Sequence, residues 1–495
     1  VLKQLMREFG IGVKKLSNQD NKGNEIASFE NGYMFMFYAL KPMSYTTFLS
    51  FFKRAKYPIF RNDKDKNGEP LQLSKADEGQ YLIVTPQEQF MISTGKRFFK
   101  GYNDYNDILR MIFDLETEGL DPRKHRIKLN GIRMNRPVTI RGKEYQNFER
   151  IFDIKGKTKA EKDASELRII DTMLKIIYTF KPDVITGHNV ENFDWNFIIV
   201  RCEMLGTTLE EMSAPYFNGD FIRKETRESS LKLGGEVETF KRTIVPNTII
   251  TDSLHAVRRA QATDSNFLKA TLKYSTNYLG LKKDNRVYTP GEEIDKILTD
   301  ETNQYAFNDT DGDWYIYDPT FVPKVITPDP TKTVEYFQIL LNHDREVNEV
   351  SGGTIERKYS DFQTAEYLYD EYIKGIELEN TNATTRKGKN GDKFTVYTKN
   401  IILDGYEEVT GQYIVNRYLL DDLWECDKVE HRYNTSNFLI CKMLPVPFQK
   451  CCTMGTAGQW KSIMLAWAYE NNLAVPMFTD TKSFTGGLSR LLKVG

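Results

Sequence analysis

Two groups of residues in the sequence have the types and spacing of divalent-metal ligands. Asp114 and Glu116 end an apolar run, and Asp194 closes an Asn-x-x-x-Phe-Asp segment that contains Asn189 and Phe193. Side chains two residues apart in an extended strand share one face, so Asp114 and Glu116 can bind the same ion. Acids that converge from several elements are what a two-metal phosphodiesterase site requires. Taken alone, Asp114 and Glu116 can be interpreted as a solvated acidic turn, and Asp194 as a helix-capping acid. Both groups together, in this order along the chain, favour the metal site.

A fourth acid is expected on a helix later in the chain. Tyr418 and Asp422 are four residues apart and share a helical face, whereas Asp421 points about 100° away and is expected to be solvated. A tyrosine hydroxyl beside a metal-binding aspartate can hold an attacking water, and the alternative is an amphipathic helix with a chance Tyr/Asp pair. Tyr305 and Asp309 have the same spacing, but the turn-forming residues that follow predict that these two need not share a helical face.

These acids require a sheet and helices to position them. Residues 108–113 predict a buried strand and residues 163–180 a helix that Pro182 ends. Residues 184–186 predict a short strand, and residues 194–205 a second helix. Alternation of strand and helix favours an α/β layer structure with a central sheet.

The rest of the sequence falls into regions that differ in composition and hydrophobic pattern. The N-terminal part has aromatic, strand-like runs at 33–40 and 80–85, and residues 223–243 predict a hairpin around two glycines. Residues 284–400 are polar and loop-rich, which indicates an insertion, and residues 411–472 are strongly helical in pattern.

Composition restricts the classes of function. A chain of 495 residues predicts two or three domains, and its net charge of −1 means that any nucleic-acid surface must be local. The five cysteines have no metal-ligand spacing and are expected to be reduced thiols. No apolar run is long enough for a membrane span, so no membrane partner is expected.

With these motifs the chain resembles the family B DNA polymerases, most closely those of tailed bacteriophages of the crAss-like kind. In that family Asp-x-Glu, Asn-x-x-x-Phe-Asp and Tyr-x-x-x-Asp are the three motifs of the 3′→5′ proofreading exonuclease. Thr251–Leu254 resembles the family's Asp-Ser-Leu strand, which we interpret as structural, and Phe484-Thr-Gly486-Gly487 resembles its Tyr-x-Gly-Gly element, with Phe in place of Tyr.

Residue roles follow from this resemblance. It implies that the metal ligands are Asp114, Glu116, Asp194 and Asp422, that these four and Tyr418 are the catalytic residues, and that Asn189, Phe193, Phe484, Gly486 and Gly487 contact DNA. It also implies two divalent ions, Mg²⁺ or Mn²⁺, as cofactors.

The resemblance also implies an architecture. An α/β, RNase H-like exonuclease domain with a central mixed sheet would follow an α+β N-terminal domain and precede a helical segment. The implied domains are an N-terminal domain at 1–105, the exonuclease domain at 106–432 with an insertion at 284–400, a helical linker at 433–475, and the start of a polymerase palm at 476–495.

The implied partners are primer-template DNA and single-stranded 3′ ends, the polymerase portion and phage replisome proteins, in the cytoplasm of a bacterial host. The sequence stops before the polymerase catalytic motifs, so we expect a piece of a longer or split polymerase that does not itself polymerise DNA. Two alternatives stay open: a catalytically silent DNA-binding platform, and a free-standing ribonuclease of the same superfamily. The ribonucleases often have a His-x-x-x-x-Asp motif, which no histidine of this chain provides.

Overall fold

The computed structural model describes most of the chain in two compact units. The first unit comprises residues 1–100, 440–447 and 456–495, and the second comprises residues 101–439 and 448–455. The described residues are 10–20, 22–26, 32–39, 82, 84–234, 236–299, 304–317 and 406–476, with the backbone of short strands between 326 and 398.

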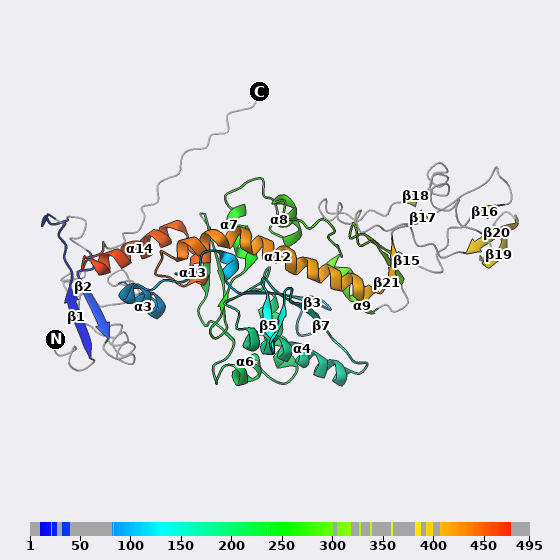
Figure 1. Cartoon of the computed structure of the whole chain (residues 1–495), viewed down its shortest axis with the longest axis horizontal. Coiled ribbons are helices and arrows are strands. Elements are labelled where there is room, and N and C mark those ends of the chain that lie inside the picture. The colour runs from blue at the N-terminus through cyan, green and yellow to red at the C-terminus, as the bar shows by residue number, and fades with distance from the viewer. Residues whose placement is uncertain are drawn as a thin grey trace, which may run out of the picture. The chain divides into compact units, whose positions relative to one another are not determined.

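A five-stranded mixed sheet forms the centre of the second unit (Figure 1). Its order is β13-β8-β3-β4-β7, in which β8 runs parallel to both β13 and β3, while β4 runs antiparallel to both β3 and β7. The expected α/β fold with a central mixed sheet is therefore confirmed. The strands are β3 (Arg110–Thr117), β4 (Ile127–Met134), β7 (Glu149–Asp153), β8 (Val184–Thr186) and β13 (Ile249–Ile250).

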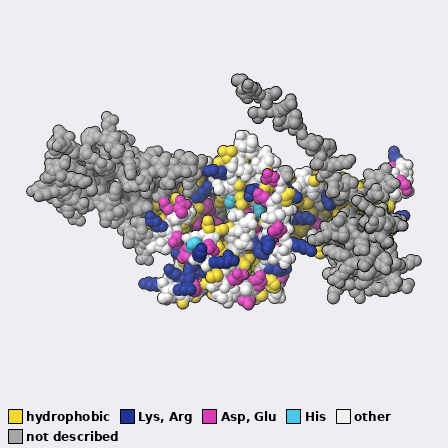
Figure 2. Space-filling model, turned by 180° about the vertical axis from the view of Figure 1, so that it is seen from behind, with side chains coloured by type: hydrophobic (Ala, Val, Ile, Leu, Met, Phe, Trp, Pro, Cys, Tyr) yellow, Lys and Arg dark blue, Asp and Glu magenta, His cyan; other side chains and the backbone are white. Residues whose placement is uncertain are grey.

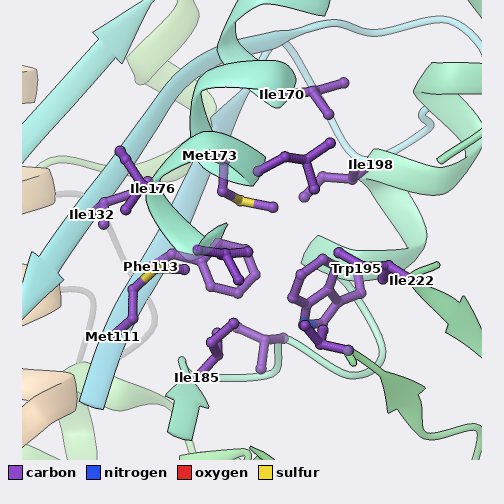
Figure 3. Close-up of a cluster of buried hydrophobic side chains, with 14 of the residues drawn as sticks. Met111, Phe113, Ile132, Ile170, Met173, Ile176, Ile185, Trp195, Ile198 and Ile222 are labelled. Carbon is purple, nitrogen blue, oxygen red and sulfur yellow. The ribbon is translucent and has the colours of Figure 1, made fainter. Parts of the chain in front are cut away.

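One face of β3 packs into the main hydrophobic core (Figure 3). Met111, Phe113 and Leu115 alternate along the strand and belong to this core. Helix α4 (Lys159–Phe180) and helix α5 (Asp194–Met204) cover it, and the Phe113 and Trp195 rings meet edge to face at 5.1 Å. Large buried side chains therefore hold β3 in place from this side.

The other face of β3 lies against helix α12 (Gly411–Cys441). Ile112 packs with Leu423 and Cys426 of that helix. Because side chains of a strand alternate between faces, Asp114 and Glu116 fall on the same face as Ile112. The period of the strand therefore places both acids toward α12, away from the apolar core.

Buried polar contacts fix α12 to the sheet. The Glu430 carboxylate, fully buried, accepts hydrogen bonds from the hydroxyls of Tyr105 and Thr251, both at 2.8 Å, and of Thr186 at 3.2 Å. Thr251 directly follows β13 and Thr186 lies in β8, so one carboxylate ties the helix to neighbouring strands. Buried polar groups satisfied in this way fix a unique packing arrangement.

Helix α4 shows why the sequence folds locally as it does. Thr158 and Glu161 form a capping box, which starts the helix four residues before the predicted residue 163. Lys181 ends it in the left-handed conformation directly before Pro182, as the proline predicts. The capping box thus extends the N-terminus of α4 by one turn, which the hydrophobic periodicity alone did not predict.

Several other predicted elements are present, with two corrections. The hairpin expected at 223–243 is formed by β10 and β11, and the helical region at 411–472 by α12 to α14. Residues 80–85 were expected to be a strand-like run, but Thr85 is the N-cap of helix α3, and residues 80, 81 and 83 lie outside the described residues. Thr251–Leu254 is not a strand either, because Asp252 caps helix α7 and its carboxylate accepts from the Leu254 N–H.

The remaining elements are shorter. The first unit contains β1 (Ile11–Lys15), β2 (Phe35–Ala39), α3 (Pro86–Thr94) and α14 (Thr456–Glu470). The second unit contains the helices η3 (Tyr105–Asp107), α6 (Leu209–Ser213), η4 (Ala214–Tyr216), α7 (Ser253–Gln261), α8 (Leu272–Tyr278), α9 (Gly291–Thr299) and α13 (Phe448–Thr453). Its other strands include β5 (Val138–Ile140), β6 (Lys143–Tyr145), β9 (Arg223–Lys224), β10 (Ser229–Leu233), β11 (Glu236–Phe240) and β12 (Thr243–Ile244).

Part of the expected insertion at 284–400 is described. Strand β14 (Gln304–Phe307) pairs with β15 (Trp314–Tyr317) and β21 (Glu407–Val409). Residues 318–405 lie outside the described residues apart from the backbone of β16 (Ile326–Thr327), β17 (Phe337–Gln338), β18 (Lys358–Tyr359), β19 (Asn382–Lys387) and β20 (Lys393–Thr398). The predicted domain bounds stay predictions.

The surface carries charges of both signs. Figure 2 shows Lys and Arg side chains interspersed with Asp and Glu over the described part of one face. All five cysteines are buried free thiols. Among the described residues, no helix is both long and apolar enough to cross a membrane.

Gly131 determines how closely α12 approaches the sheet. It lies opposite Asp114 in the β3–β4 pairing, and a Cβ atom there would sit 2.8 Å from Leu419 Cγ and 3.0 Å from Leu423 Cδ1. We expect Gly131→Ala to push the helix outward and to lower the free energy of unfolding by about 1–3 kcal/mol in a urea titration. Gly291→Ala is the matched control, because a Cβ there has no heavy atom within 4 Å. Equal stability of the two variants would contradict the packing argument.

Candidate active site

Three carboxylates from two elements converge at one point. Asp114 and Glu116 come from β3 and Asp422 from α12, and each provides an oxygen within 4.8 Å of the others. Glu116 is 9% exposed and Asp422 is 6% exposed. The packing of α12 on the sheet therefore completes a cluster of three buried or half-buried acids.

Asp194 lies beside this cluster. It is the first residue of α5 and is 1% exposed, and its Oδ1 accepts a hydrogen bond from the Leu115 N–H at 3.2 Å. The contact joins the start of α5 to β3 between Asp114 and Glu116. A carboxylate in the first turn of a helix also interacts favourably with the helix dipole.

The pKa values of these acids reflect their crowding. Burial, followed by the charges of Asp194, Glu116 and Asp422, holds the pKa of Asp114 well above its usual range. Burial and the charge of Asp422 raise the pKa of Glu116 to about 8. Burial raises the pKa of Asp194 to about 7, against hydrogen bonds from backbone N–H groups that lower it. A nearby cation would therefore favour the charged forms of Asp114, Glu116 and Asp194.

The residues present fit a divalent cation. Carboxylate oxygens are the ligands that Mg²⁺ prefers in proteins, and three of them lie within reach of one another. A dication between them would replace mutual repulsion by attraction and so lower the raised pKa values of Asp114 and Glu116.

Tyr418 lies one helical turn before Asp422 and has positive charge near its ring. The Lys273 ammonium is 4.9 Å from the ring centroid and the Arg286 guanidinium 5.1 Å. Burial and the charge of Asp422 hold the pKa of the Tyr418 hydroxyl well above its usual range, so the hydroxyl keeps its proton. It can therefore donate a hydrogen bond at neutral pH.

A cavity opens beside the acids. It has a volume of about 480 Å³, and its wall includes Asp114 and Asp422 together with Tyr418 and Lys273. This volume lies in the range typical of small-molecule sites.

The prediction for Asp421 was wrong. This carboxylate is 1% exposed and accepts hydrogen bonds from the Lys283 ammonium at 2.5 Å and the Val287 N–H at 2.9 Å. Residues 283–287 cover the face of α12 that the helical pattern assigned to solvent. The other Tyr-x-x-x-Asp pair does not share a helical face, as predicted. Tyr305 lies in β14 and Asp309 in the following turn, where it pairs with Arg417 at 2.6 Å.

The residues expected to contact DNA are only partly described. Asn189 has a φ of +73°, and its N–H donates to Asp252 Oδ1 at 2.8 Å, so it forms the tight turn before α5. Phe193 packs against the apolar core with its ring 5.5 Å from that of Phe197. Their contact with DNA stays a prediction, and Phe484, Gly486 and Gly487 lie outside the described residues.

Sequence reasoning missed Arg286 and Lys273. Arg286 is fully buried and contacts Asp422, and Lys273 faces Tyr418. Arg286 lies in a polar run, Lys282-Lys-Asp-Asn-Arg286, that reads as an exposed loop. The one available signal was a density of basic residues next to the expected insertion, which does not identify a buried arginine.

Comparison with known proteins supports part of these predictions. Residues 93–271 match the family model described as "DNA polymerase family B, exonuclease domain", a region that contains Asp114, Glu116 and Asp194 and ends before Asp422. The second unit combines an α/β fold around a mixed sheet with a cluster of acids, and this match makes residues 93–271 similar to the exonuclease domain of family B DNA polymerases. Exonuclease domains of this family use divalent metals, which agrees with the cluster. The match covers less than half of the chain.

A solved structure is also similar, that of the family B DNA polymerase from the hyperthermophilic archaeon Pyrobaculum calidifontis. The TM-score is 0.44 and the sequence identity 13%, over 84% of this chain and 39% of that chain. The chain thus spans well under half of the length of that polymerase. No curated protein matches.

The raised pKa of Glu116 predicts how stability depends on pH. The folded state holds the proton of Glu116 up to about pH 8, whereas an unfolded glutamate releases it near pH 4.5. The stabilising contribution is therefore complete below pH 4.5 and is lost as pH rises to 8. At about 1.4 kcal/mol per pKa unit this amounts to several kcal/mol in the metal-free protein.

The comparison with Glu116→Gln isolates this effect. The lowered pKa values of His188 and His255 act in the opposite direction, so the wild type alone is not informative. In EDTA, the free energy of unfolding should fall more steeply between pH 5 and 8 in the wild type than in the variant. Added Mg²⁺ should remove most of the difference. Parallel pH profiles for the two proteins would refute the assignment.

Proposed function

We propose that this chain is the 3′→5′ exonuclease portion of a family B DNA polymerase, which hydrolyses the 3′-terminal phosphodiester of DNA in proofreading. The observation that carries the proposal is the meeting of Asp422 with Asp114 and Glu116, in a domain of which residues 93–271 match the family's exonuclease. Asp114 and Asp422 also line a cavity. Asp422 lies outside the matched region, so the geometry of the cluster is independent support.

The chain's own residues have distinct roles in this reaction. Asp114, Glu116, Asp194 and Asp422 hold two divalent ions, Mg²⁺ or Mn²⁺. Such ions activate a water and stabilise the leaving 3′ oxygen. Tyr418 donates or accepts a hydrogen bond that orients the attacking water.

The cavity supplies the rest of the substrate site. It is large enough for a terminal nucleotide, and Lys273 provides a positive charge for the phosphate next to the Tyr418 ring. Asn189, Phe193, Phe484, Gly486 and Gly487 are the proposed DNA contacts beyond the acids. Primer-template DNA and single-stranded 3′ ends are the proposed substrates.

The wider setting is also proposed. A polymerase portion is the proposed partner of this chain. Phage replisome proteins would be partners in a bacterial host's cytoplasm during infection. A silent DNA-binding platform is less favoured, because a platform would not need four acids that destabilise one another.

Digestion of a 5′-labelled single-stranded oligonucleotide with Mg²⁺ tests the activity. The wild type should shorten the DNA from its 3′ end, and the Asp114→Ala/Glu116→Ala double variant should lose this activity by at least about 1,000-fold. Asp422→Asn should lose it too, whereas the matched control Asp309→Asn should retain it, because Asp309 is an exposed turn residue. If the folded wild type with bound metal leaves the DNA intact, the catalytically silent DNA-binding platform becomes the better hypothesis.

Tyr418→Phe tests the role of the hydroxyl. The ring can keep its contacts with Lys273 and Arg286, so only the hydrogen bond to water is lost. We expect kcat to fall by about 10- to 100-fold with little change in KM. Tyr413→Phe is the control on the same helix, since Tyr413 contacts Phe307 by its ring. An unchanged kcat in Tyr418→Phe would remove Tyr418 from the reaction.

A further inference from the structure

A fully buried arginine, Arg286, contacts the acid cluster through Asp422. The Arg286 side chain is 0% exposed, and its Nη2 binds Asp422 Oδ1. Its Nε donates to Glu425 Oε2 at 3.2 Å, and its Nη1 donates to the Val287 carbonyl at 2.7 Å and to the Tyr418 carbonyl at 3.1 Å. All three nitrogens of the planar guanidinium thus donate hydrogen bonds in a fixed arrangement, which the single ammonium nitrogen of a lysine could not reproduce.

The same guanidinium also contacts two aromatic rings. It lies 5.1 Å from the ring centroid of Tyr418 and 4.9 Å from that of Tyr288. Tyr418 and Asp422 are one turn apart on α12, so a single side chain touches both residues that this helix contributes to the site. Cation–π contact restricts the tyrosine while the hydrogen bond restricts the aspartate.

The segment that carries Arg286 is itself anchored to α12. The Val287 N–H donates to Asp421 and the Lys283 N–H donates to Glu425 at 3.2 Å. The Lys283 ammonium also binds Asp421. Backbone and side-chain contacts on both sides of Arg286 therefore hold it in one place, and the guanidinium is preorganised rather than mobile.

We propose that Arg286 is a positioning residue for the metal site, which holds the Asp422 carboxylate and the Tyr418 ring in the orientation needed for metal binding and hydrolysis. This inference rests on the proposed function. One oxygen of Asp422 is bound to the guanidinium, so the other is left for a metal ion. Groups that orient a metal ligand in this way raise metal affinity, and their loss typically costs 10- to 100-fold.

The opposite role is physically possible and gives the opposite result. A guanidinium next to Asp422 could instead act as a counter-ion that competes with the metal for the same carboxylate. In that case removal of Arg286 would leave four unneutralised acids and would tighten metal binding. The direction of the change in affinity therefore separates positioning from competition.

The test is Mn²⁺ binding without DNA, measured by titration calorimetry on the full chain. Arg286→Gln is expected to bind Mn²⁺ about 10- to 100-fold more weakly than the wild type. Arg286→Lys keeps the positive charge but loses the planar set of N–H donors, so this variant should bind Mn²⁺ almost as weakly as Arg286→Gln. In the digestion assay at saturating Mn²⁺, both variants should lower kcat more than they raise KM.

Arg201→Gln is the matched control. Arg201 is also a buried arginine, bound at 2.7 and 2.8 Å to the two oxygens of Glu166 and at 3.0 Å to the Pro122 carbonyl, so its hydrogen bonds are directed away from the cluster. Its removal should lower stability but leave Mn²⁺ affinity unchanged. If Arg201→Gln and Arg286→Gln lose affinity equally, the effect is general destabilisation and the proposal is wrong.

Glu425→Gln keeps the proposal testable if Arg286→Gln does not fold. It weakens the support of Arg286 without removing the guanidinium, and a smaller loss of Mn²⁺ affinity is expected. Affinity equal to or tighter than that of the wild type in a folded variant would overturn the proposal. Failure of the wild type to bind Mn²⁺ would instead count against the proposed metal site itself.

Discussion

The packing of helix α12 onto the β3–β4 face of the sheet is the contact on which the acid cluster depends. Gly131 leaves room for Leu419 and Leu423, which flank Asp422 along the helix, and it lies directly opposite Asp114. The fully buried Glu430 holds the same helix to neighbouring strands by hydrogen bonds. Apolar contacts therefore set the distance of α12 from the sheet, and polar contacts set its position along it.

The cluster is assembled at a cost in stability. The raised pKa values of Asp114, Glu116 and Asp194 show that burial and mutual repulsion disfavour their charged forms. Folding must therefore be driven by other parts of the domain, chiefly the core between β3, α4 and α5. Functional sites in general accept such local instability because the surrounding structure compensates for it.

The sequence predicted the sheet and the acids better than it predicted their surroundings. Asp114 and Glu116 follow from the period of a strand, and Asp422 from helical spacing. Asp421 was misjudged because a helical pattern assigns a second face to solvent unless another segment covers it, and residues 283–287 do so. Arg286 could not be found, because its burial depends on contacts between a polar loop and α12 that no local pattern encodes.

Chain length between the acids matters far less than helical register. The entropic cost of closing a loop grows only with the logarithm of its length, so a long insertion between Asp194 and Asp422 is tolerated. A slip of one residue along α12, by contrast, would rotate Asp422 by about 100° away from the other acids and put Asp421 or Leu423 in its position. The contacts of Asp421, Glu425 and Glu430 oppose that rotation from different sides of the helix. These three acids of α12 thus determine that Asp422 is the one that faces Asp114 and Glu116.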